Sequence, residues 1–237
     1  MNDKKEIEII FQEPSLYLYP YLRLNALSKL ATGKKWRELI GNDFGEDIAK
    51  LENSYIESMS AGQKRVAFSN IVFDRLDKKI QDSGNGGLVL CDEPDASLDT
   101  KNKNILTEKL SEIAGSNKFG IIYVSHDPSV IAAISSKVSK KIKVFECKAF
   151  DGGSTIIKSF IENAQTNHSL KDEKMGFPQW PLKYLEILKV QDLVVSLSAD
   201  KSTHFRYCNG ENALSLPAGK VIVLYGRNGS GKSTFLK

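Results

Sequence analysis

The sequence predicts an α/β fold built around a mainly parallel sheet. The clearest indication is the run Leu88–Cys91, which is apolar at every position, as in a strand buried on both faces. A second such run, Gly120–Val124, follows a segment with helical periodicity, and a third, Val221–Leu224, lies near the C-terminal end. Because buried strands alternate with helical segments, helices are expected to cover the sheet.

The composition is that of an ordinary globular protein. The chain has 237 residues, of which 41% are hydrophobic and 26% charged, so it can bury a sizeable core. A net charge of +4 is too small to indicate nucleic-acid binding by itself. The 3 cysteines are widely spaced without a CxxC pair, which argues against a disulfide framework or a zinc site. The apolar runs are too short to cross a bilayer, and no secretory signal opens the chain.

The first third of the chain predicts one strand and a helical subdomain. Residues 6–11 alternate between polar and apolar before Pro14 ends the strand. Residues 15 to about 80 are mostly helical in pattern. Within them, apolar positions separated by seven, three and four residues predict one helix face over 63–81. These positions are Val66, Phe73, Leu76 and Ile80.

The remaining elements complete the sheet and its cover. A helix is expected over 103–114, and Asp127-Pro128 reads as the N-cap and first residue of a short helix. A turn at Asp151-Gly152-Gly153 predicts a hairpin. The polar, proline-containing stretch 163–181 reads as a linker. Further strands are expected over 143–147, 154–157, 185–190 and 193–197.

A phosphate-binding motif lies near the C-terminal end. Residues 226–233 match GxxxxGK[ST] and directly follow the strand predicted over Val221–Leu224. Backbone N–H groups of such a glycine-rich turn point at a phosphate chain, Lys232 would reach the terminal phosphates, and the Ser233 hydroxyl would bind Mg²⁺. The alternative, an accidental glycine turn, does not account for the preceding strand. The expected contact residues are Gly226, Asn228, Gly229, Ser230, Gly231, Lys232, Ser233 and Thr234.

A pair of acids ends the buried strand at 88–91. Asp92 and Glu93 would be costly at this place unless they had partners. In a nucleotide site, Asp92 would belong to the magnesium shell and Glu93 would polarise the attacking water. The alternative is a carboxylate pair that only caps the strand end.

Further short motifs make the function specific. They are Met59–Gln63 before a helix, Ser97-Leu98-Asp99 after the acid pair, and Val124–Asp127 at the next strand end. With them, the chain resembles the ABC-type ATPases, the ATP-binding cassette proteins. Their signature Leu-Ser-Gly-Gly-Gln is matched by Met59–Gln63, with Met for Leu and Ala for the first Gly. By the same resemblance, Gln12 matches the Q-loop glutamine, Asp92 the Walker B aspartate, Glu93 the catalytic glutamate, Asp99 the D-loop aspartate and His126 the switch histidine.

The resemblance implies a P-loop NTPase sheet with a helical subdomain, and ATP and Mg²⁺ as ligands. Glu93, His126 and Gln12 would be catalytic, and Ser233, Asp92 and Gln12 would hold the metal. Residues Ser60, Gly62, Gln63 and Asp99 would face nucleotide on a second cassette. Two of these have simpler interpretations, since Ser60 could merely cap a helix and His126 could merely bond a carbonyl.

An aromatic residue upstream of the phosphate loop is expected to stack on adenine. Phe205 is our choice, with Tyr207 and His204 near it. The alternative is an aromatic residue that only lies on a strand face.

The order of the motifs departs from the family, in which the phosphate loop comes first. Either the cassette is circularly permuted, with 163–181 as the new connection, or the chain joins two half-cassettes of a tandem protein or a truncated reading frame. In both cases residues 1–162 and 182–237 are expected to pack together as one cassette. Because the helix after the phosphate loop looks truncated, we expect marginal stability and weak activity.

The resemblance leaves the driven process open. Residues 11–14 and their spacing to the signature resemble transporter cassettes, which implies a cytoplasmic subunit at the inner face of the membrane, with a second cassette and a membrane permease as partners. One alternative is a non-transport ABC ATPase of DNA repair or defence, although nucleic acid is not indicated. Another is an inactive fragment that binds nucleotide without turnover.

Overall fold

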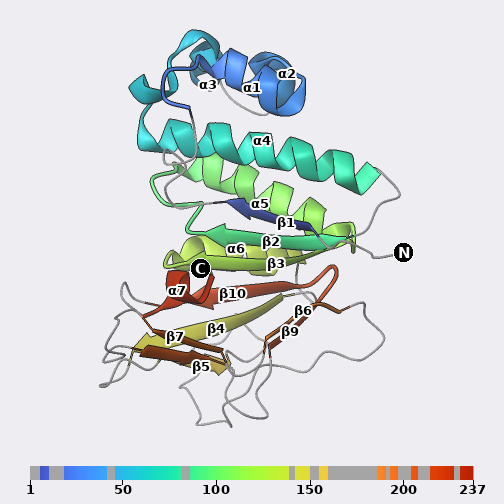
Figure 1. The fold of residues 1–237 in the computed structure, drawn as a ribbon, viewed down its shortest axis with the longest axis vertical. Coiled ribbons are helices and arrows are strands. Elements are labelled where there is room, and N and C mark those ends of the chain that lie inside the picture. Colours follow the sequence, from blue (N-terminus) through green and yellow to red (C-terminus); the bar gives the residue numbers. More distant parts are fainter. Residues whose placement is uncertain are drawn as a thin grey trace.

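A central sheet organises the molecule. The computed structural model describes residues 6–10, 19–41, 46–81, 86–138, 142–149, 155–159, 186–190, 193–196, 204–207, 214–226 and 230–236. Its 6-stranded sheet has the order β1-β2-β3-β10-β4-β5 (Figure 1). The strands are β1 (Glu6–Ile10), β2 (Gly87–Asp92), β3 (Phe119–Ser125), β4 (Ile142–Ala149), β5 (Thr155–Ser159) and β10 (Val221–Tyr225). All neighbours pair in parallel except β4 and β5, which form an antiparallel hairpin. The predicted α/β fold is therefore confirmed.

Helices cover the sheet and form a separate layer above it (Figure 1). They are α1 (Leu24–Thr32), α2 (Trp36–Ile40), α3 (Glu46–Ala49), α4 (Ala61–Gln81), α5 (Thr100–Gly115), α6 (Pro128–Val138) and α7 (Lys232–Leu236), with the short 3₁₀ turns η2 (Lys50–Asn53) and η3 (Ile56–Ser58). Two small antiparallel sheets pair β6 (Glu186–Val190) with β9 (Leu214–Pro217) and β7 (Leu193–Ser196) with β8 (His204–Tyr207).

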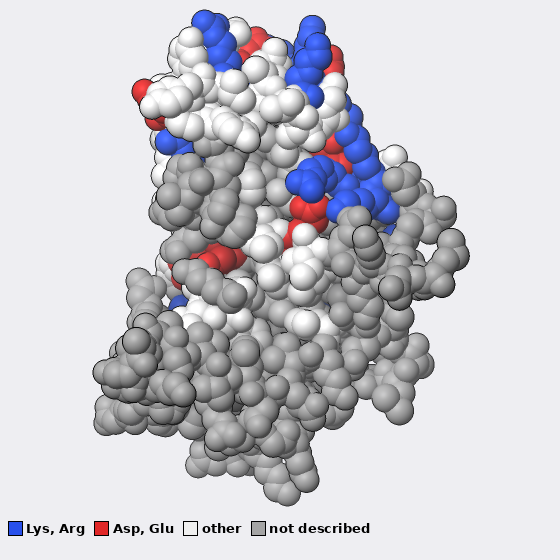
Figure 2. Space-filling model, viewed as in Figure 1, with Lys and Arg blue, Asp and Glu red and all other residues white. Residues whose placement is uncertain are grey.

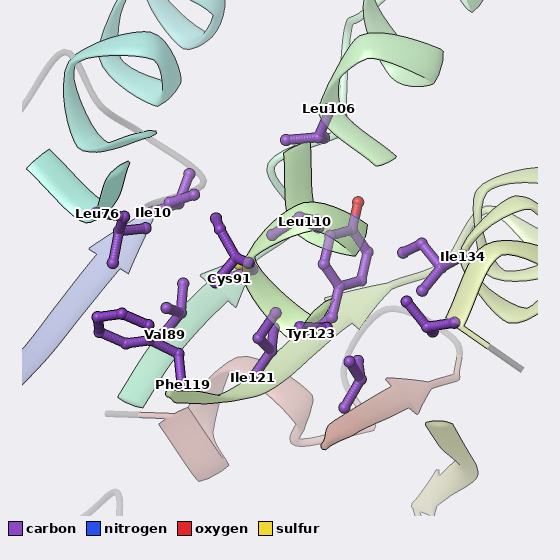
Figure 3. Packing of buried hydrophobic residues seen from close by; sticks show 14 of the residues in the cluster. Ile10, Leu76, Val89, Cys91, Leu106, Leu110, Phe119, Ile121, Tyr123 and Ile134 are labelled. Carbon is purple, nitrogen blue, oxygen red and sulfur yellow. The ribbon is translucent and has the colours of Figure 1, made fainter. Parts of the chain in front are cut away.

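The central strands carry no charged or strongly polar residue before their carboxyl ends, because both of their faces are buried. Along β3, Ile121 and Tyr123 belong to the cluster under α4, α5 and α6, whereas Ile122 and Val124 belong to the cluster on the opposite face. Figure 3 shows the first cluster, in which the ring of Tyr123 lies between residues of β2, α5 and α6. The second cluster includes Phe235 of α7. This two-sided burial is the physical origin of the apolar runs.

Strand β10 comes from the far end of the chain but lies in the middle of the sheet. It pairs with β3 on one side, where Leu224 is opposite Val124, and with β4 on the other, where Leu224 is opposite Phe145. The first and last thirds of the sequence therefore share one sheet and the cluster that contains both Ile10 and Val223.

The helical subdomain has its own core and is tied to α4. Trp36 is fully buried, and its indole N–H donates to the carbonyl of Ile48 at 2.9 Å. Buried Asp74 of α4 accepts from Lys34 at 2.5 Å and pairs with Lys78 at 2.9 Å. Burial alone would raise the pKa of Asp74, but hydrogen bonds from these two lysines outweigh it and the pKa lies below the ordinary value of 3.8.

Basic side chains gather around the C-terminal end of α4 (Figure 2). Besides the two lysines of Asp74, Arg75 and Lys79 pair with buried Glu8 of β1, at 3.0 and 2.7 Å. These ion pairs hold α4 against both the edge strand β1 and the helical subdomain. The positive charges near the C-terminal end of α4 also interact favourably with the negative end of the helix dipole.

Most predicted elements are present with small shifts of their ends. The helix expected over 63–81 begins at Ala61, and the one that starts at Pro128 extends to Val138. Strands β8 and β9 were not predicted as elements. The linker expected over 163–181 lies outside the described residues. Among the described residues, no helix combines the length and apolar character that a bilayer crossing requires.

Candidate nucleotide site

The carboxyl ends of three neighbouring parallel strands bring the predicted motifs together. Strands β2, β3 and β10 run side by side in the same direction, and the register places Asp92 and Leu224 opposite Val124. The segments that follow these strands therefore start at one edge of the sheet, which is where open α/β sheets bind ligands. They carry Glu93, His126 and Gly226.

The phosphate-loop serine and the strand-end aspartate are in direct contact. The Ser233 hydroxyl donates a hydrogen bond of 2.6 Å to Asp92 Oδ1. Ser233 is the second residue of α7, and Asp92 is the last residue of β2. The sequence predicted both as metal ligands, and the structure places them side by side.

Lys232 is buried between the loop and the second acid. Its side chain is 4% exposed, and its ammonium group donates to the carbonyl of Gly226 at 2.8 Å. Nζ also lies 4.0 Å from Glu93 Oε1. A buried cation must have partners, and here the partners are groups expected at a phosphate site.

Glycines allow the loop to pass close to its neighbours. A Cβ on Gly226 would lie 2.4 Å from the carbonyl oxygen of Cys147 and 2.8 Å from Ser230 Oγ, so no side chain fits there. Gly231 has a φ of 84°, a left-handed conformation that side chains disfavour. Ser230 and Gly231 are both buried. The tight course of the loop thus explains these two glycines of the motif.

Glu93 and His126 face each other across the ends of β2 and β3. His126 Nδ1 lies 3.4 Å from Glu93 Oε1, and the histidine side chain is half exposed whereas the glutamate is buried. Glu93 has a φ of 45°, unusual for a residue with a side chain. Its N–H donates to the carbonyl of Val124 at 3.0 Å, which ties it to β3.

The signature segment forms the N-terminus of α4 beside the turn after β2. Ser60 and Gln63 form a capping box: the Gln63 N–H donates to Ser60 Oγ at 3.2 Å, and the Ser60 N–H donates to Gln63 Oε1 at 2.9 Å. A Cβ on Gly62 would lie 2.6 Å from the carbonyl oxygen of Ser97. The simple capping role considered for Ser60 is therefore present, and it leaves Ser60 exposed.

The other predicted site residues that the structure describes lie at the start of α5, in α7 and in β8. Asp99 is exposed and caps α5, accepting from the N–H of Asn102 at 2.8 Å. Thr234 is a half-buried residue of α7. Phe205 lies in β8, opposite Val195 of β7. The predictions for Gln12, Asn228 and Gly229 fall outside the described residues.

Four buried polar residues near the site were not predicted as site residues: Arg65, Asp95, Tyr123 and Ser125. Asp95 accepts hydrogen bonds from the hydroxyls of Tyr123 and Ser125, and the guanidinium of Arg65 donates to the carbonyl of Ala96 at 2.5 Å. Burial and the neighbouring Asp95 carboxylate raise the pKa of Tyr123 well above its ordinary value, so this hydroxyl remains a donor. In the sequence, the apolar neighbours of Tyr123 indicated only that it is a core residue, and nothing pointed to its hydrogen bond with Asp95.

The donor set at Ser233 and Asp92 fits a hard divalent cation. A hydroxyl and a carboxylate oxygen are ligands that Mg²⁺ accepts, and the ion usually takes its remaining ligands from phosphates and water. Within the described part of the chain, no three acidic, histidine or cysteine side chains gather as a metal cage. A site completed by phosphate oxygens does not need such a cage.

Several known proteins with similar sequences are named as ATP-binding proteins. The chain is 24% identical to the uncharacterized ABC transporter ATP-binding protein YejF of Escherichia coli K12, over 97% of this chain and 44% of that protein. It is 28% identical to the bacitracin export ATP-binding protein BceA of Halalkalibacterium halodurans, over 57% of this chain and 51% of that protein. The translation initiation factor rli1 of Schizosaccharomyces pombe is 24% identical over 81% of this chain and 31% of that factor.

The chain spans about half or less of the length of these relatives. No protein-family profile and no solved structure matches the chain. In its α/β sheet, in the residues gathered at the carboxyl edge of that sheet and in its sequence relatives, this chain is similar to the ABC-type ATPases.

Proposed function

We propose that the chain binds ATP with Mg²⁺ and hydrolyses it as an ABC-type nucleotide-binding domain. One observation carries the proposal: Ser233 bonds Asp92 at 2.6 Å while the neighbouring Lys232 lies 4.0 Å from Glu93. A loop serine and lysine thus meet two acids from a distant part of the chain. These four groups are what an Mg²⁺-nucleotide site requires.

Each side chain has a distinct role in this proposal. Lys232 and the backbone of 226–233 bind the β- and γ-phosphates, and Ser233 and Asp92 hold the cation. Bound Mg²⁺ would neutralise charge on the phosphate oxygens. Gln12, Asn228, Gly229 and Thr234 are proposed to complete the phosphate and metal contacts, and Phe205 to stack on adenine.

Glu93 is the proposed general base. Its carboxylate would accept a proton from the water that attacks the γ-phosphorus, while the bond to the β-γ bridging oxygen breaks and ADP leaves. His126 lies 3.4 Å from Glu93 Oε1, and we propose that it hydrogen-bonds the γ-phosphate when nucleotide is bound. A bound phosphate would also replace Glu93 as the partner of the Lys232 ammonium group. The Glu93 carboxylate would then be available to accept a proton from water.

A second cassette is proposed to complete the site. Ser60 and Asp99 are exposed, and Gly62 and Gln63 are half buried, at the side of the molecule formed by the start of α4 and the turn before α5. Hydroxyl and N–H groups at the start of a helix suit a γ-phosphate held on another subunit. Closure on ATP and opening after hydrolysis would then be the mechanical output.

The decisive experiment is Glu93→Gln. We expect ATP turnover to fall by at least about 100-fold, because the base is lost, while calorimetry finds MgATP binding retained. Glu108→Gln on exposed α5 is the matched control and should behave as the unchanged chain. Unchanged turnover in Glu93→Gln would remove Glu93 from its role. A well-folded chain that gives no heat with MgATP would end the whole proposal.

Transport is the process we propose that this ATPase drives, with a membrane permease as partner at the inner face of the membrane. The names of several relatives support it, including the spermidine/putrescine import ATP-binding protein PotA of Mycoplasma capricolum, 28% identical over 57% of this chain and 38% of that protein. The helical subdomain also exposes large side chains, with Tyr21 80% and Leu30 73% exposed. Such a surface suits a protein partner.

A non-transport role is the second candidate. It is favoured by relatives named for translation, rli1 and the elongation factor 3 of Mycosarcoma maydis, the latter 26% identical over 83% of this chain and 18% of that factor. Co-purification with an identified multi-span membrane protein, lost in Tyr21→Ser/Leu30→Ser, would support transport. Stimulation of ATP turnover by duplex DNA or ribosomes would support the second candidate.

The order of the motifs also has a parallel. The match to YejF runs through 97% of this chain in sequence order within 44% of that longer protein. We infer that a longer natural chain also has the signature and Walker B segment before a phosphate-loop segment. This inference favours two joined half-cassettes over a circular permutant.

A further inference from the structure

A buried carboxylate lies at the centre of the turn that follows β2. Asp95 is 2% exposed, and both of its oxygens are engaged. Tyr123 donates to Oδ1 at 2.6 Å and Ser125 donates to Oδ2 at 2.9 Å. Both donors belong to β3, so Asp95 anchors the turn that follows β2 to the neighbouring strand β3. Figure 3 shows the Tyr123 hydroxyl pointing away from the strands of the sheet.

This turn holds two residues in an unfavourable backbone conformation. Glu93 and Ser97 have φ values of 45° and 61°, although neither is glycine. Pro94 follows Glu93 and further restricts its backbone. A residue in this conformation persists only where the surroundings fix it. Glu93 is the proposed base, so its position depends on how firmly the turn is anchored.

The same hydroxyl network fixes the backbone around His126. Ser125 Oγ donates to Asp95 and accepts from the N–H of Asp127 at 3.0 Å, so it links the turn after β2 to the residue that follows His126. On the opposite side of the turn, Arg65 of α4 donates to the Ala96 carbonyl. The turn is therefore held between β3 and α4, with Asp95 as its side-chain anchor on β3.

We propose that Asp95 is a positioning residue for hydrolysis, which holds Glu93 and His126 in register through Tyr123 and Ser125. It touches neither the phosphate loop residues nor the nucleotide in this proposal. It acts by keeping the strained Glu93 backbone and the segment 125–127 in one fixed arrangement. The inference rests on the proposed function, because it assigns Asp95 a part in that same reaction.

The test compares Asp95→Asn, which keeps the size but loses one acceptor, with Tyr123→Phe, which removes a single donor. We expect kcat to fall by about 10- to 100-fold for Asp95→Asn and less for Tyr123→Phe, because small misplacements of a base have effects of this size. The KM for ATP should stay within about twofold, since the phosphate loop is untouched. Asp77→Asn, on the far part of α4, should leave kcat and KM unchanged.

Crystal structures of the unchanged chain and Asp95→Asn give a readout that does not depend on turnover. The separation of Glu93 Oε1 and His126 Nδ1 should increase, and the Glu93 φ should leave the left-handed region. An Asp95→Asn structure that keeps both, or an unchanged kcat in a folded Asp95→Asn protein, would overturn the inference. If Asp95→Asn does not fold, Tyr123→Phe is judged by the same two criteria. An unchanged chain that binds MgATP without turnover contradicts the proposed hydrolysis, and the two structures then decide the positioning role alone.

Discussion

Ser233 and Asp92 are 141 residues apart in the sequence and share a hydrogen bond of 2.6 Å. The contact exists because β10 lies in the same sheet as β2, with β3 between them. A loop from the end of the chain thereby reaches an acid from its first half.

Lys232→Ala should weaken MgATP binding by about 10- to 100-fold, because a buried ammonium that bonds phosphate contributes on the order of 1.5–3 kcal/mol. Lys101→Ala, an exposed change at the start of α5, is the control. Titration calorimetry of both variants measures the effect. Equal affinities for the two variants would show that Lys232 is not a phosphate ligand.

Asp92→Asn should reduce the dependence of nucleotide binding on Mg²⁺. The amide oxygen can still accept from Ser233, so the fold is kept, but the charge that attracts a divalent cation is lost. ATP titrations with Mg²⁺ and with excess chelator should differ for the unchanged chain and converge for the variant. Asp47→Asn on exposed α3 should preserve the difference. A full Mg²⁺ response in Asp92→Asn would exclude Asp92 from the metal shell.

Gly62→Ala should destabilise the protein by about 1–3 kcal/mol, because the new Cβ would lie 2.6 Å from the Ser97 carbonyl oxygen and the backbone must move. Gly115→Ala at the end of α5 meets nothing within 4 Å and should be neutral or slightly stabilising. Urea unfolding monitored by circular dichroism measures both. Equal unfolding midpoints would mean that α4 and the turn do not pack this closely.

Asp127→Ala should cost about 1–2 kcal/mol at neutral pH, because Asp127 caps α6. Its carboxylate accepts from the Ser129 N–H at 2.9 Å and from Lys103 at 2.5 Å. The hydrogen bond from Lys103, followed by that from Ser129, lowers the pKa of Asp127 below its ordinary value of 3.8.

The lowered pKa fixes the sign of the pH dependence of this effect. Since the unfolded chain binds the proton more readily, the stabilisation by Asp127 is present above pH 3.8 and is lost as the pH falls below that value. The stability difference between the unchanged chain and Asp127→Ala should therefore shrink in acid, and Asp127→Asn should show a smaller loss at neutral pH. A difference that stays constant down to acid unfolding would contradict the ion pair.

Local patterns in the sequence predicted most of the helices and strands correctly. The apolar runs predicted β2, β3 and β10 because two-sided burial leaves no polar position. The helix expected at Asp127-Pro128 begins at Pro128. Strands β8 and β9 were missed because they are only four residues each and lack a distinctive apolar pattern.

The strand order and the buried network around Asp95 could not be predicted. Nothing local specifies that β10 lies between β3 and β4, because that position is decided by packing between distant segments. Asp95 sits in a polar turn, where an acid is usually exposed. Only the arrangement of β2 beside β3 buries it next to Tyr123 and Ser125.

The central place of β10 also governs how the protein is made on the ribosome. Until residues 221–225 have been synthesised, β3 and β4 each present an unpaired edge, and neither can pair with the other across the gap. Both edges therefore remain open to pairing with other strands while residues 150–220 are being synthesised.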